Sequence, residues 1–592
     1  MWLAADTGGT FTDVVSADGR VVKVLSTPVD PSRAVADGVG ALAGGKRPDL
    51  LAHGTTVATN ALLERRGAPV AIVTNRGLAD VIEIARQDRP SLYDLWADRP
   101  EPLVPRRLRF EVGGRLDAAG RELEPVDPEQ VAALPLAGVE VVAICLLHAD
   151  LNATHERAVA AALARDELDV SCSSDVSPEF REYERTVTTV VNASLRPVCR
   201  DYLRRLEPLA EEVLVMTSAA GLLPAAEAAD LPVALLLSGP AGGVRAATAA
   251  AVAAGYPDAV TFDMGGTSTD VCLVTGGVPA PAAQRTVGGL PVRRPSLDIH
   301  TIGAGGGSIA FLDAGGALRV GPRSAGAEPG PACYGRGGVD PTVTDADLVL
   351  ARIAGDAAFP GLGRLDVDAA RSALDGAGVD AAGVGEVVDA AMEQAVRVVS
   401  VARGVDPTGL ALVAFGGAGP LHACAIAGAL GMAAVVVPPR AGVLSAVGLL
   451  CSPRQRELVR SWPTPRAHDG LDRALAALAA EARAAVGAGA DVETALDCRY
   501  AGQSHELTVA TVSAFDDEHR RRNGYARPGA PVEVVALRAT ARLSSPIDAL
   551  PPAGERRPAK GPCVLAEPDC TVWVPEGWHA DVDDAGNWVI VT

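Results

Sequence analysis

Basic residues are in the minority in this chain of 592 residues, which has 53 lysines and arginines against 73 aspartates and glutamates. A nucleic-acid backbone needs a basic protein face, so the net charge of −20 argues against nucleic acid as a partner. Aromatic residues are also few, at 4% of the chain, while alanine, glycine and valine abound. The cores are therefore expected to consist of small aliphatic side chains.

Long hydrophobic runs and paired cysteines are missing as well. No uninterrupted apolar stretch reaches the ~18 residues of a membrane span, and the start MWLAAD has neither the basic nor the apolar part of a secretion signal. The ten cysteines are scattered, with no CxxC pair and no cysteine–histidine cluster at zinc spacing. We therefore expect a cytoplasmic protein that has no structural disulfides or zinc and no contact with a membrane.

What the chain does contain is a pair of matching glycine-rich segments, at 6–13 (DTGGTFTD) and 263–270 (DMGGTSTD). Each lies between two apolar runs, which predicts a β-hairpin with a glycine turn. The glycines let backbone N–H groups approach an anion, and the threonines add hydroxyl donors. The acid before each turn would repel a bare phosphate, which indicates a hydrated divalent cation between them. One segment alone is explained by a plain hairpin, but the pair predicts a clamp on Mg-ATP.

The rest of the chain alternates strand-like and helix-like runs, which predicts α/β domains. The expected elements are strands at 70–73, 139–147, 235–237, 435–437, 498–500, 507–512, 532–543 and 588–591, and helices at 31–43, 152–164, 178–212 and 471–486. The glycine- and proline-rich stretch 276–363 suggests ordered loops around a site. We expect an N-terminal lobe at 1–175, a second lobe at 176–455 and a β-rich C-terminal domain at 456–592.

Further glycine-rich turns follow in a definite order. Residues 238–244 (SGPAGGV) open a helix before the second hairpin, 416–420 (GGAGP) join a strand to a helix, and 445–448 (SAVG) open another helix. Such a turn lets a planar ring or a phosphate lie against bare backbone, although each turn alone is equally consistent with no ligand. The small residues Ala241, Gly242 and Ala446 are expected to let two helices cross closely.

In this order the motifs resemble the superfamily of actin, sugar kinases and heat-shock chaperones, whose two lobes close over ATP. Within it, the chain resembles the hydantoinase A/5-oxoprolinase family. The stretches that carry this resemblance are 6–13, 53–67, 178–192, 238–244, 262–271, 299–310, 329–345, 415–422 and 500–507. The resemblance implies a two-lobed actin-like ATPase (ribonuclease H-like) fold with a smaller β-rich C-terminal domain.

The family also implies ATP-driven opening of a cyclic amide such as a hydantoin, 5-oxoproline or a lactam. Phosphorylation of the carbonyl oxygen would prepare the ring for attack by water, a step that needs mainly positioning and charge neutralisation. Two alternatives are an activating subunit of an ATP-dependent ketone carboxylase and, from another class, an ATP-operated switch or chaperone. A simple switch does not need the glycine-rich stretch 276–345, which favours an enzyme.

The resemblance assigns roles to individual residues. Asp6 and Asp263 would hold Mg²⁺ through water, and with Thr267 they are the catalytic candidates. The nucleotide-binding candidates are Thr7, Gly8, Gly9, Thr10, Gly265, Gly266, Thr267, Gly416, Gly417 and Gly419. The substrate candidates are His53, Thr55, Thr56 and Arg86, for which a structural histidine, a helix cap and a solvated loop are the alternatives. Asp13 and Asp270 either support the metal site or take part in ordinary hairpin hydrogen bonding.

A complete set of hydrolytic residues is not apparent in the sequence, which has no recognisable Ser/His/Asp set and no zinc cluster. Ring opening is therefore expected only with a B-type subunit, in a homo- or hetero-oligomer. The C-terminal domain is shorter than in other family members, and we expect it to lie near the partner and to have no nucleotide role. The GxGGGS stretch at 303–308 lacks the last glycine of a dinucleotide-binding fingerprint, so we exclude that reading.

Overall fold

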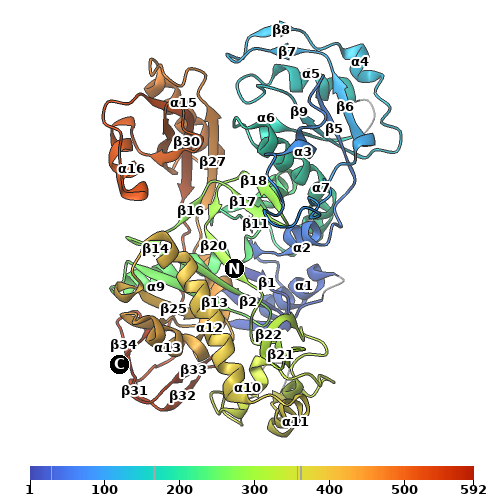
Figure 1. The fold of residues 1–592 in the computed structure, drawn as a ribbon. Helices are drawn as coiled ribbons and strands as arrows, with labels where there is room; N and C mark the ends of the chain where they lie inside the picture. Colours follow the sequence, from blue (N-terminus) through green and yellow to red (C-terminus); the bar gives the residue numbers. More distant parts are fainter. Residues whose placement is uncertain (28–29, 165–167, 357, 360–362) are drawn as a thin grey trace.

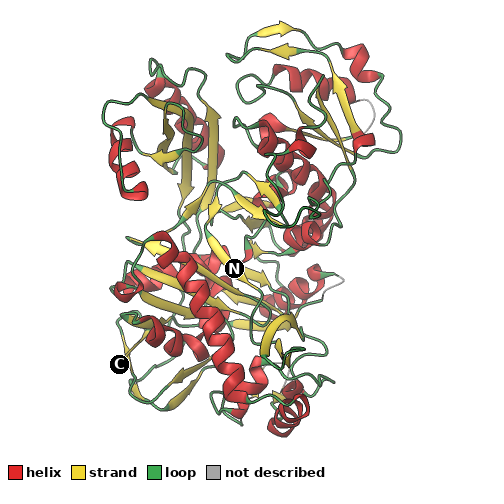
Figure 2. Ribbon diagram, in the orientation of Figure 1, coloured by secondary structure: helices red, strands yellow, loops and turns green. Residues whose placement is uncertain are grey.

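The computed structural model describes residues 1–592 except 28–29, 165–167, 357 and 360–362. The end of the glycine-rich stretch predicted at 276–363 therefore lies partly outside the described residues. Two arms rise from a larger body, one in blue and cyan and one in orange (Figure 1). Helices flank the strands in the body and in both arms (Figure 2). No helix in the described part of the chain combines the length and the apolarity needed to cross a membrane.

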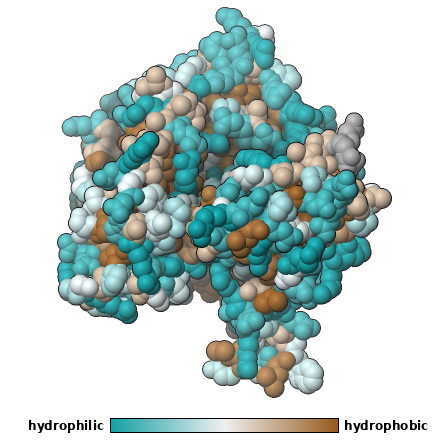
Figure 3. All heavy atoms as spheres, turned by 90° about the horizontal axis from the view of Figure 1, so that it is seen from above, coloured by the Kyte–Doolittle hydropathy of each residue, from teal (hydrophilic) through white to brown (hydrophobic). Residues whose placement is uncertain are grey.

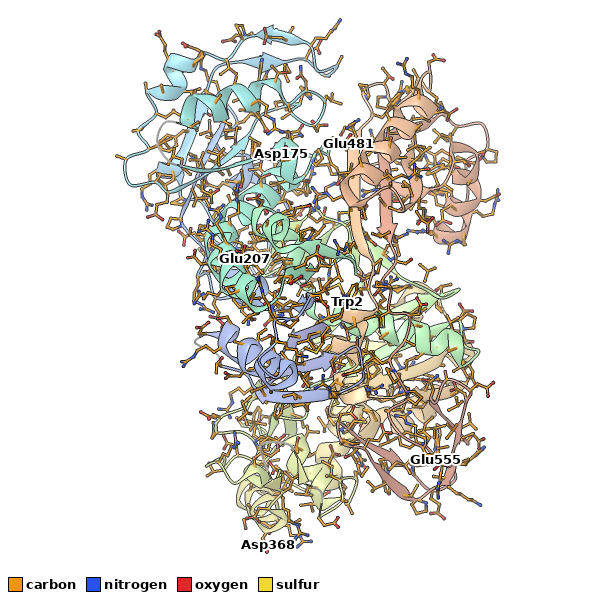
Figure 4. All side chains as sticks on the ribbon, turned by 180° about the vertical axis from the view of Figure 1, so that it is seen from behind. Trp2, Asp175, Glu207, Asp368, Glu481 and Glu555 are labelled. Carbon is orange, nitrogen blue, oxygen red and sulfur yellow. The ribbon has the colours of Figure 1, made fainter. Side chains whose placement is uncertain are left out.

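The largest sheet holds the first glycine-rich hairpin. Its ten strands run in the order β29-β28-β30-β27-β12-β11-β4-β1-β2-β3. In chain order they are β1 (Trp2–Thr7), β2 (Phe11–Ser16), β3 (Val21–Leu25), β4 (Leu50–Gly54), β11 (Glu212–Met216), β12 (Leu222–Pro224), β27 (Arg454–Ser461), β28 (Asp491–Tyr500), β29 (Leu507–Val509) and β30 (Val532–Leu543). Strand β1 is antiparallel to β2 and parallel to β4. Seen from behind, Trp2 marks the start of β1 near the middle of the molecule (Figure 4).

The second sheet holds the second hairpin and repeats this arrangement. Its main path is β15-β14-β13-β25-β26-β35-β34-β31. These strands are β13 (Ala259–Met264), β14 (Thr269–Thr275), β15 (Val278–Pro279), β25 (Ala411–Phe415), β26 (Ala434–Val437), β31 (Ala559–Lys560), β34 (His579–Val582) and β35 (Trp588–Val591). Strand β13 is antiparallel to β14 and parallel to β25, as β1 is to β2 and β4. The two predicted lobes therefore present their hairpins in the same setting.

Both large sheets take strands from more than one of the predicted domains. β11 and β12 follow the long helix α7 (Glu182–Leu206) yet extend the sheet of β1, and β27 to β30 extend it further. At the end of the chain β35 pairs with β26 of the other sheet. The boundaries at 175/176 and 455/456 remain a prediction about domains, and the sheets cross both of them.

The blue and cyan arm is built on a parallel sheet in the order β10-β9-β5-β6. Its strands are β5 (Val70–Asn75), β6 (Arg109–Val112), β9 (Val141–Cys145) and β10 (Asp169–Cys172). The predicted strands at 70–73 and 139–147 are thus confirmed. The predicted helices correspond to α1 (Pro31–Ala43), α5 (Thr154–Leu163), α7 and α15 (Leu471–Val486).

The strand predicted at 235–237 is wrong. This run overlaps the end of a 3₁₀ helix, η4 (Pro232–Leu235), and its leucines pack in the core beside α7. A short apolar run bounded by proline does not distinguish a buried strand from a buried helical turn by its periodicity. The strand predicted at 435–437 is confirmed as β26.

Two helices cross closely between the sheets of the two hairpins, as the small residues predicted. They are α9 (Gly239–Ala253) and α14 (Leu444–Leu450). The Cβ position of Gly242 lies 2.8 Å from the carbonyl oxygen of Ser445, and a methyl group on Gly448 would overlap the backbone of Gly242. Only glycine permits this separation, because the neighbouring atoms are backbone and cannot turn aside.

A buried charge cluster joins three helices of the second lobe: α10 (Val343–Val349), α12 (Ala381–Val399) and α13 (Gly419–Leu430). The ring of His422 lies 2.6 Å from Asp389 through Nδ1 and 3.1 Å from Asp347 through Nε2. Arg352 also contacts Asp347, at 3.2 Å. Burial alone would lower the pKa of His422, but the two carboxylates outweigh it and raise the pKa to about 10. The imidazole is therefore charged at neutral pH.

We expect the stabilising contribution of His422 to depend on pH. Its pKa is higher in the folded protein than the ordinary value of 6.5, so the contribution is fully present below pH 6.5 and is lost as the pH rises towards 10. His422→Asn should lower the free energy of unfolding by about 3 kcal/mol at neutral pH, because it removes the buried positive charge that contacts both carboxylates and leaves them Arg352 alone. Denaturant titrations at several pH values measure this, with the half-exposed His579→Asn as control. Parallel pH profiles for wild type and His422→Asn would contradict it.

Candidate functional site

The two hairpins place their acidic residues in the same register. In the first hairpin Asp6 lies opposite Asp13 on the neighbouring strand. In the second, Asp263 lies opposite Asp270. Each hairpin therefore directs one pair of carboxylates to the same end of its sheet, as the repeated sequence motif predicted.

The turns of the two hairpins are closed by equivalent hydrogen bonds. The backbone N–H of Gly8 donates to the carbonyl of Phe11 at 3.0 Å. The N–H of Gly265 donates to the carbonyl of Ser268, also at 3.0 Å. Both turns thus have the tight form that the glycine pairs predicted.

The hairpin tips face each other across the molecule. The Cβ position of Gly266 lies 3.2 Å from Oγ1 of Thr10, and the Cβ position of Gly9 lies 3.9 Å from Oγ1 of Thr267. Each threonine therefore reaches over the glycine turn of the opposite lobe. This reciprocal contact places backbone N–H groups and hydroxyls of both lobes around one space.

The first aspartate of each hairpin, Asp6 or Asp263, packs closely against a glycine. That glycine lies at the end of the neighbouring parallel strand or directly after it. A methyl group on Gly54, at the end of β4, would overlap Oδ1 of Asp6. Similarly, a methyl group on Gly416, just after β25, would overlap Oδ1 of Asp263. Gly416 also has a φ of +82°, which favours glycine. Gly54 and Gly416 are therefore required by the placement of the carboxylates.

A cleft of about 350 Å³ lies between the hairpins. The predicted site residues that line it are Asp6, Thr7, Gly8, Gly9, Thr10, Thr56, Asp263, Gly265, Gly266, Thr267, Gly416 and Gly417. Gly419 is not among the lining residues; its Cβ position lies 3.3 Å from the carbonyl oxygen of Phe262, so it packs against β13. The structure thus brings predicted site residues of both lobes together around one cleft.

The cleft gathers four partly buried carboxylates, those of Asp6, Asp13, Asp263 and Asp270. Burial raises the pKa of Asp6 to about 7 and that of Asp270 to about 6. Burial, followed by the charges of Asp270 and Asp6, raises the pKa of Asp263 well above its ordinary value. Burial raises the pKa of Asp13 too. Oxygen ligands that carry this unfavourable charge suit a hard divalent cation such as Mg²⁺, so the residues present fit the predicted metal.

Lys23 is a cleft residue that the sequence reasoning missed. Its ammonium lies 2.7 Å from Asp13 and donates a hydrogen bond to the carbonyl of Gly442 at 3.1 Å. It therefore connects β3 of the first lobe to the loop before α14 in the second. The available signal was a single charge within the apolar run of β3, Val21–Leu25.

The glycine triplet in the GxGGGS stretch supports the second hairpin. The backbone N–H of Gly306 donates to the carbonyl of Gly265 at 3.0 Å, and that of Gly307 donates to Gly266 at 2.7 Å. A side chain on Gly305 would collide with the backbone of this turn. The triplet therefore holds the turn in place, a role that sequence reasoning did not assign when it excluded a dinucleotide site.

One end of the cleft is apolar, and its residues were not predicted. Its lining includes Tyr334, Ile353, Leu365 and Leu421. Cys333, Leu348 and Ala370 pack with Ile353, Leu365 and Leu421 in one small buried cluster. Such a surface next to the Gly416 turn suits a flat, weakly polar ring.

The C-terminal part of the chain also reaches the cleft. Pro568, Asp569 and Thr571 line it, and Asp569 accepts a hydrogen bond from the N–H of Gly442 at 2.8 Å. This domain was expected to have no nucleotide role, yet part of it lines the cleft that is predicted to bind the nucleotide. The sequence did not reveal this because strands β31, β34 and β35 join the sheet of the second lobe only in the folded chain.

His53 has a structural position in place of the predicted substrate contact. Its ring is fully buried, with Nδ1 2.9 Å from the carbonyl of Ala5 and Nε2 2.7 Å from the hydroxyl of Tyr202. Burial lowers its pKa to about 4, so the ring is neutral. Nδ1–H therefore donates to Ala5 and Nε2 accepts from Tyr202, which fixes β4 between β1 and α7.

Of the other three substrate candidates, one lines the cleft and two do not. Thr56 lines the cleft, whereas Thr55 is buried and its hydroxyl accepts from the N–H of Val57 at the start of α2 (Val57–Leu63), at 3.2 Å. Arg86 is outside the cleft lining and forms a bidentate ion pair with Glu184 on α7, with a shortest nitrogen–oxygen distance of 2.5 Å. Only Thr56 therefore lies where a bound ligand would reach it.

Comparisons with known proteins agree with this architecture. The chain matches the Hydantoinase/oxoprolinase family over residues 185–457 and the Hydantoinase/oxoprolinase N-terminal region over 3–167. It is 34% identical to caprolactamase subunit alpha of Pseudomonas jessenii, over 99% of this chain and 98% of that protein. The crystal structure of the ATP-dependent caprolactamase from the same organism matches with a TM-score of 0.86 at 31% identity, covering 100% of both chains. This likeness confirms the predicted α/β, two-lobed fold.

Two further relatives are named for other reactions than the caprolactamase. The chain is 35% identical to 5-oxoprolinase 1 of Arabidopsis thaliana, over 75% of this chain but only 40% of that protein. It is 33% identical to the acetophenone carboxylase gamma subunit of Aromatoleum aromaticum, over 75% of this chain and 66% of that protein. The family profiles and these identities together show that the chain belongs to the hydantoinase/oxoprolinase family.

Proposed function

We propose that this chain is the ATP-using subunit of an enzyme that opens a cyclic amide such as a hydantoin, 5-oxoproline or a lactam. The observation that carries the proposal is the reciprocal contact of the two hairpins, which surrounds one cleft with glycine turns, hydroxyls and buried carboxylates. The relatives named caprolactamase and 5-oxoprolinase support the substrate class.

In this proposal the two turns bind the phosphates of ATP. Backbone N–H groups at Gly9 and Gly266, with the hydroxyls of Thr10 and Thr267, would orient the terminal phosphate. Asp6 and Asp263 would hold Mg²⁺ through water, in line with their raised pKa values. Mg-ATP supplies the phosphoryl group that activates the carbonyl oxygen of the amide.

The remaining cleft residues would bind the nucleoside and balance charge. Gly416 and Gly417 leave bare backbone beside the apolar end of the cleft, where the adenine ring would lie. Lys23 is ion-paired to Asp13 and would partly neutralise the charge that phosphate brings. Lys23 also donates a hydrogen bond to the carbonyl of Gly442 in the other lobe. Closure of the lobes would therefore change the contacts of the Lys23 ammonium.

A B-type partner subunit is part of the proposal. The described residues that line the cleft include no histidine and no cysteine. The bases that they do offer are aspartates, which this proposal places around the metal and the phosphates and not beside the ring. Two of the relatives are themselves named as subunits. We infer that this chain activates the amide and that hydrolysis requires the partner.

The direct test combines the purified chain with a B-type subunit, Mg-ATP and a panel of hydantoins, 5-oxoproline and lactams. We expect ADP release that depends on one of the cyclic amides, and little ring opening when the B-type subunit is omitted. Addition of a metal chelator is the control and should stop turnover. Failure of every cyclic amide to stimulate ADP release, or stoichiometric ring opening by the chain alone, would contradict the proposal.

A second candidate is the activating subunit of an ATP-dependent ketone carboxylase, which the acetophenone carboxylase relative favours. Activation of a ketone would use the same nucleotide cleft. Product formation that requires bicarbonate and a ketone would identify this alternative. ATP hydrolysis stimulated by unfolded peptide, and by neither ring nor ketone, would instead indicate a switch or chaperone.

A further inference from the structure

Four of the five most exposed large apolar side chains of the described residues lie together in one loop. Leu92, Tyr93, Leu95 and Trp96 are 75%, 96%, 83% and 91% exposed. We refer to residues 91–97 as the apolar loop. Figure 3 shows a narrow projection from the body with brown side chains at its tip, as expected for this segment. Contiguous exposed apolar side chains on a soluble protein mark an interaction site far more often than a single exposed residue does.

The apolar loop is held away from the body by polar contacts at its base. Arg99 donates hydrogen bonds to the carbonyl of Ile84 at 2.6 Å and to the carbonyl of Asp88 at 3.0 Å, which brings the two ends of the projection together. Just before it, Arg86 pairs with Glu184 of α7 through a hydrogen bond of 2.8 Å. These contacts anchor the base of the projection to the first lobe.

Short hydrogen bonds also order the tip itself. The hydroxyl of Ser91 accepts from the N–H of Asp94 at 3.0 Å, and the carboxylate of Asp94 accepts from the N–H of Trp96 at 2.9 Å. These turns orient the four apolar side chains without burying them. A loop that is already shaped loses less conformational entropy on binding.

We propose that the apolar loop is the docking site for the B-type subunit, an inference that rests on the proposed function. A partner subunit is the occupant that the relatives' names support, since caprolactamase and acetophenone carboxylase are both named by subunit. The other large exposed apolar side chains that the structure describes include Leu123, Val278, Val339 and Val401, which come from separate segments. Outside the loop, the described residues of a second copy of this chain therefore offer no comparable apolar cluster. Tyrosine and tryptophan are also the residues that most often dominate binding energy at interfaces.

The test is a double substitution, Leu95→Ser with Trp96→Ser, in the full chain co-expressed with the B-type subunit of the same genome. Because both side chains are exposed, the variant should fold and bind Mg-ATP as the wild type does. We expect its affinity for the B-type subunit to fall roughly thirtyfold or more, as for central interface residues. Leu123→Ser and Val339→Ser are matched controls, 67% and 78% exposed, and should bind as tightly as the wild type.

The possible outcomes separate this inference from the proposed function. Equal binding of wild type and double variant would overturn the docking site, while amide-dependent ADP release by the wild-type complex would leave the proposed function intact. No binding of the wild-type chain to the B-type subunit would overturn the docking site and the partner together. A wild-type dimer that the double substitution converts to a monomer, measured by light scattering without the B-type subunit, would assign the loop to self-association and overturn the proposal.

Discussion

Asp263→Asn is expected to lower Mg-ATP turnover roughly 10–100-fold. This is the usual effect of losing a side chain that contacts a metal ion indirectly, here through a bound water. The metal-free variant should be as stable as the wild type or more stable. The reason is that Asp263 is partly buried, and that desolvation, followed by the charges of Asp270 and Asp6, raises its pKa well above its ordinary value. At neutral pH its ionised form is therefore disfavoured in the folded protein, and asparagine removes that cost.

Two measurements on the same variant check this prediction. Thermal unfolding without ligand should give an equal or higher Tm, and the increase in Tm caused by Mg-ATP should shrink or vanish. Asp368→Asn is the control, because its side chain is 94% exposed, does not line the cleft and lies at the lower edge of the molecule (Figure 4). A lower Tm without ligand, combined with an unchanged response to Mg-ATP, would show that Asp263 is structural and would contradict the assignment.

Gly448→Ala is expected to lower the free energy of unfolding by about 3 kcal/mol or more, at the upper end of the range for overpacked cores. The added methyl group would overlap the carbonyl carbon and oxygen of Gly242 where α14 crosses α9. Backbone atoms cannot rotate away, so the two helices must separate. Because α14 packs against β1, which carries Asp6, nucleotide binding should fall as well.

Denaturant titration and nucleotide titration of Gly448→Ala measure both effects. Gly40→Ala is a matched control, because Gly40 lies in helix α1 and nothing lies within 4 Å of its Cβ position. That control should be neutral or slightly stabilising, since alanine favours helix over glycine. A Gly448→Ala protein with the stability and nucleotide affinity of the wild type would mean that the crossing is looser than described.

The sequence by itself determined the local parts of the site. Two matching segments with paired glycines and flanking apolar runs predicted two hairpins, and the structure has them in the same register. The helices at 31–43 and 471–486 were predicted with their observed bounds, since hydrophobic period and terminal residues act over a few neighbours. Such features are readable because their cause lies within about a dozen residues of chain.

Only the tertiary structure decided which distant residues share the cleft. Lys23, Leu421 and Asp569 meet there although no local pattern connects them. His53 carried the same motif as Thr56, yet one side chain points into the core and the other lines the cleft. The return of the C-terminal strands to both sheets is likewise set by which strand edges remain unpaired once the lobes form. These outcomes depend on packing between segments far apart in sequence, and packing energy is not encoded in any one of them.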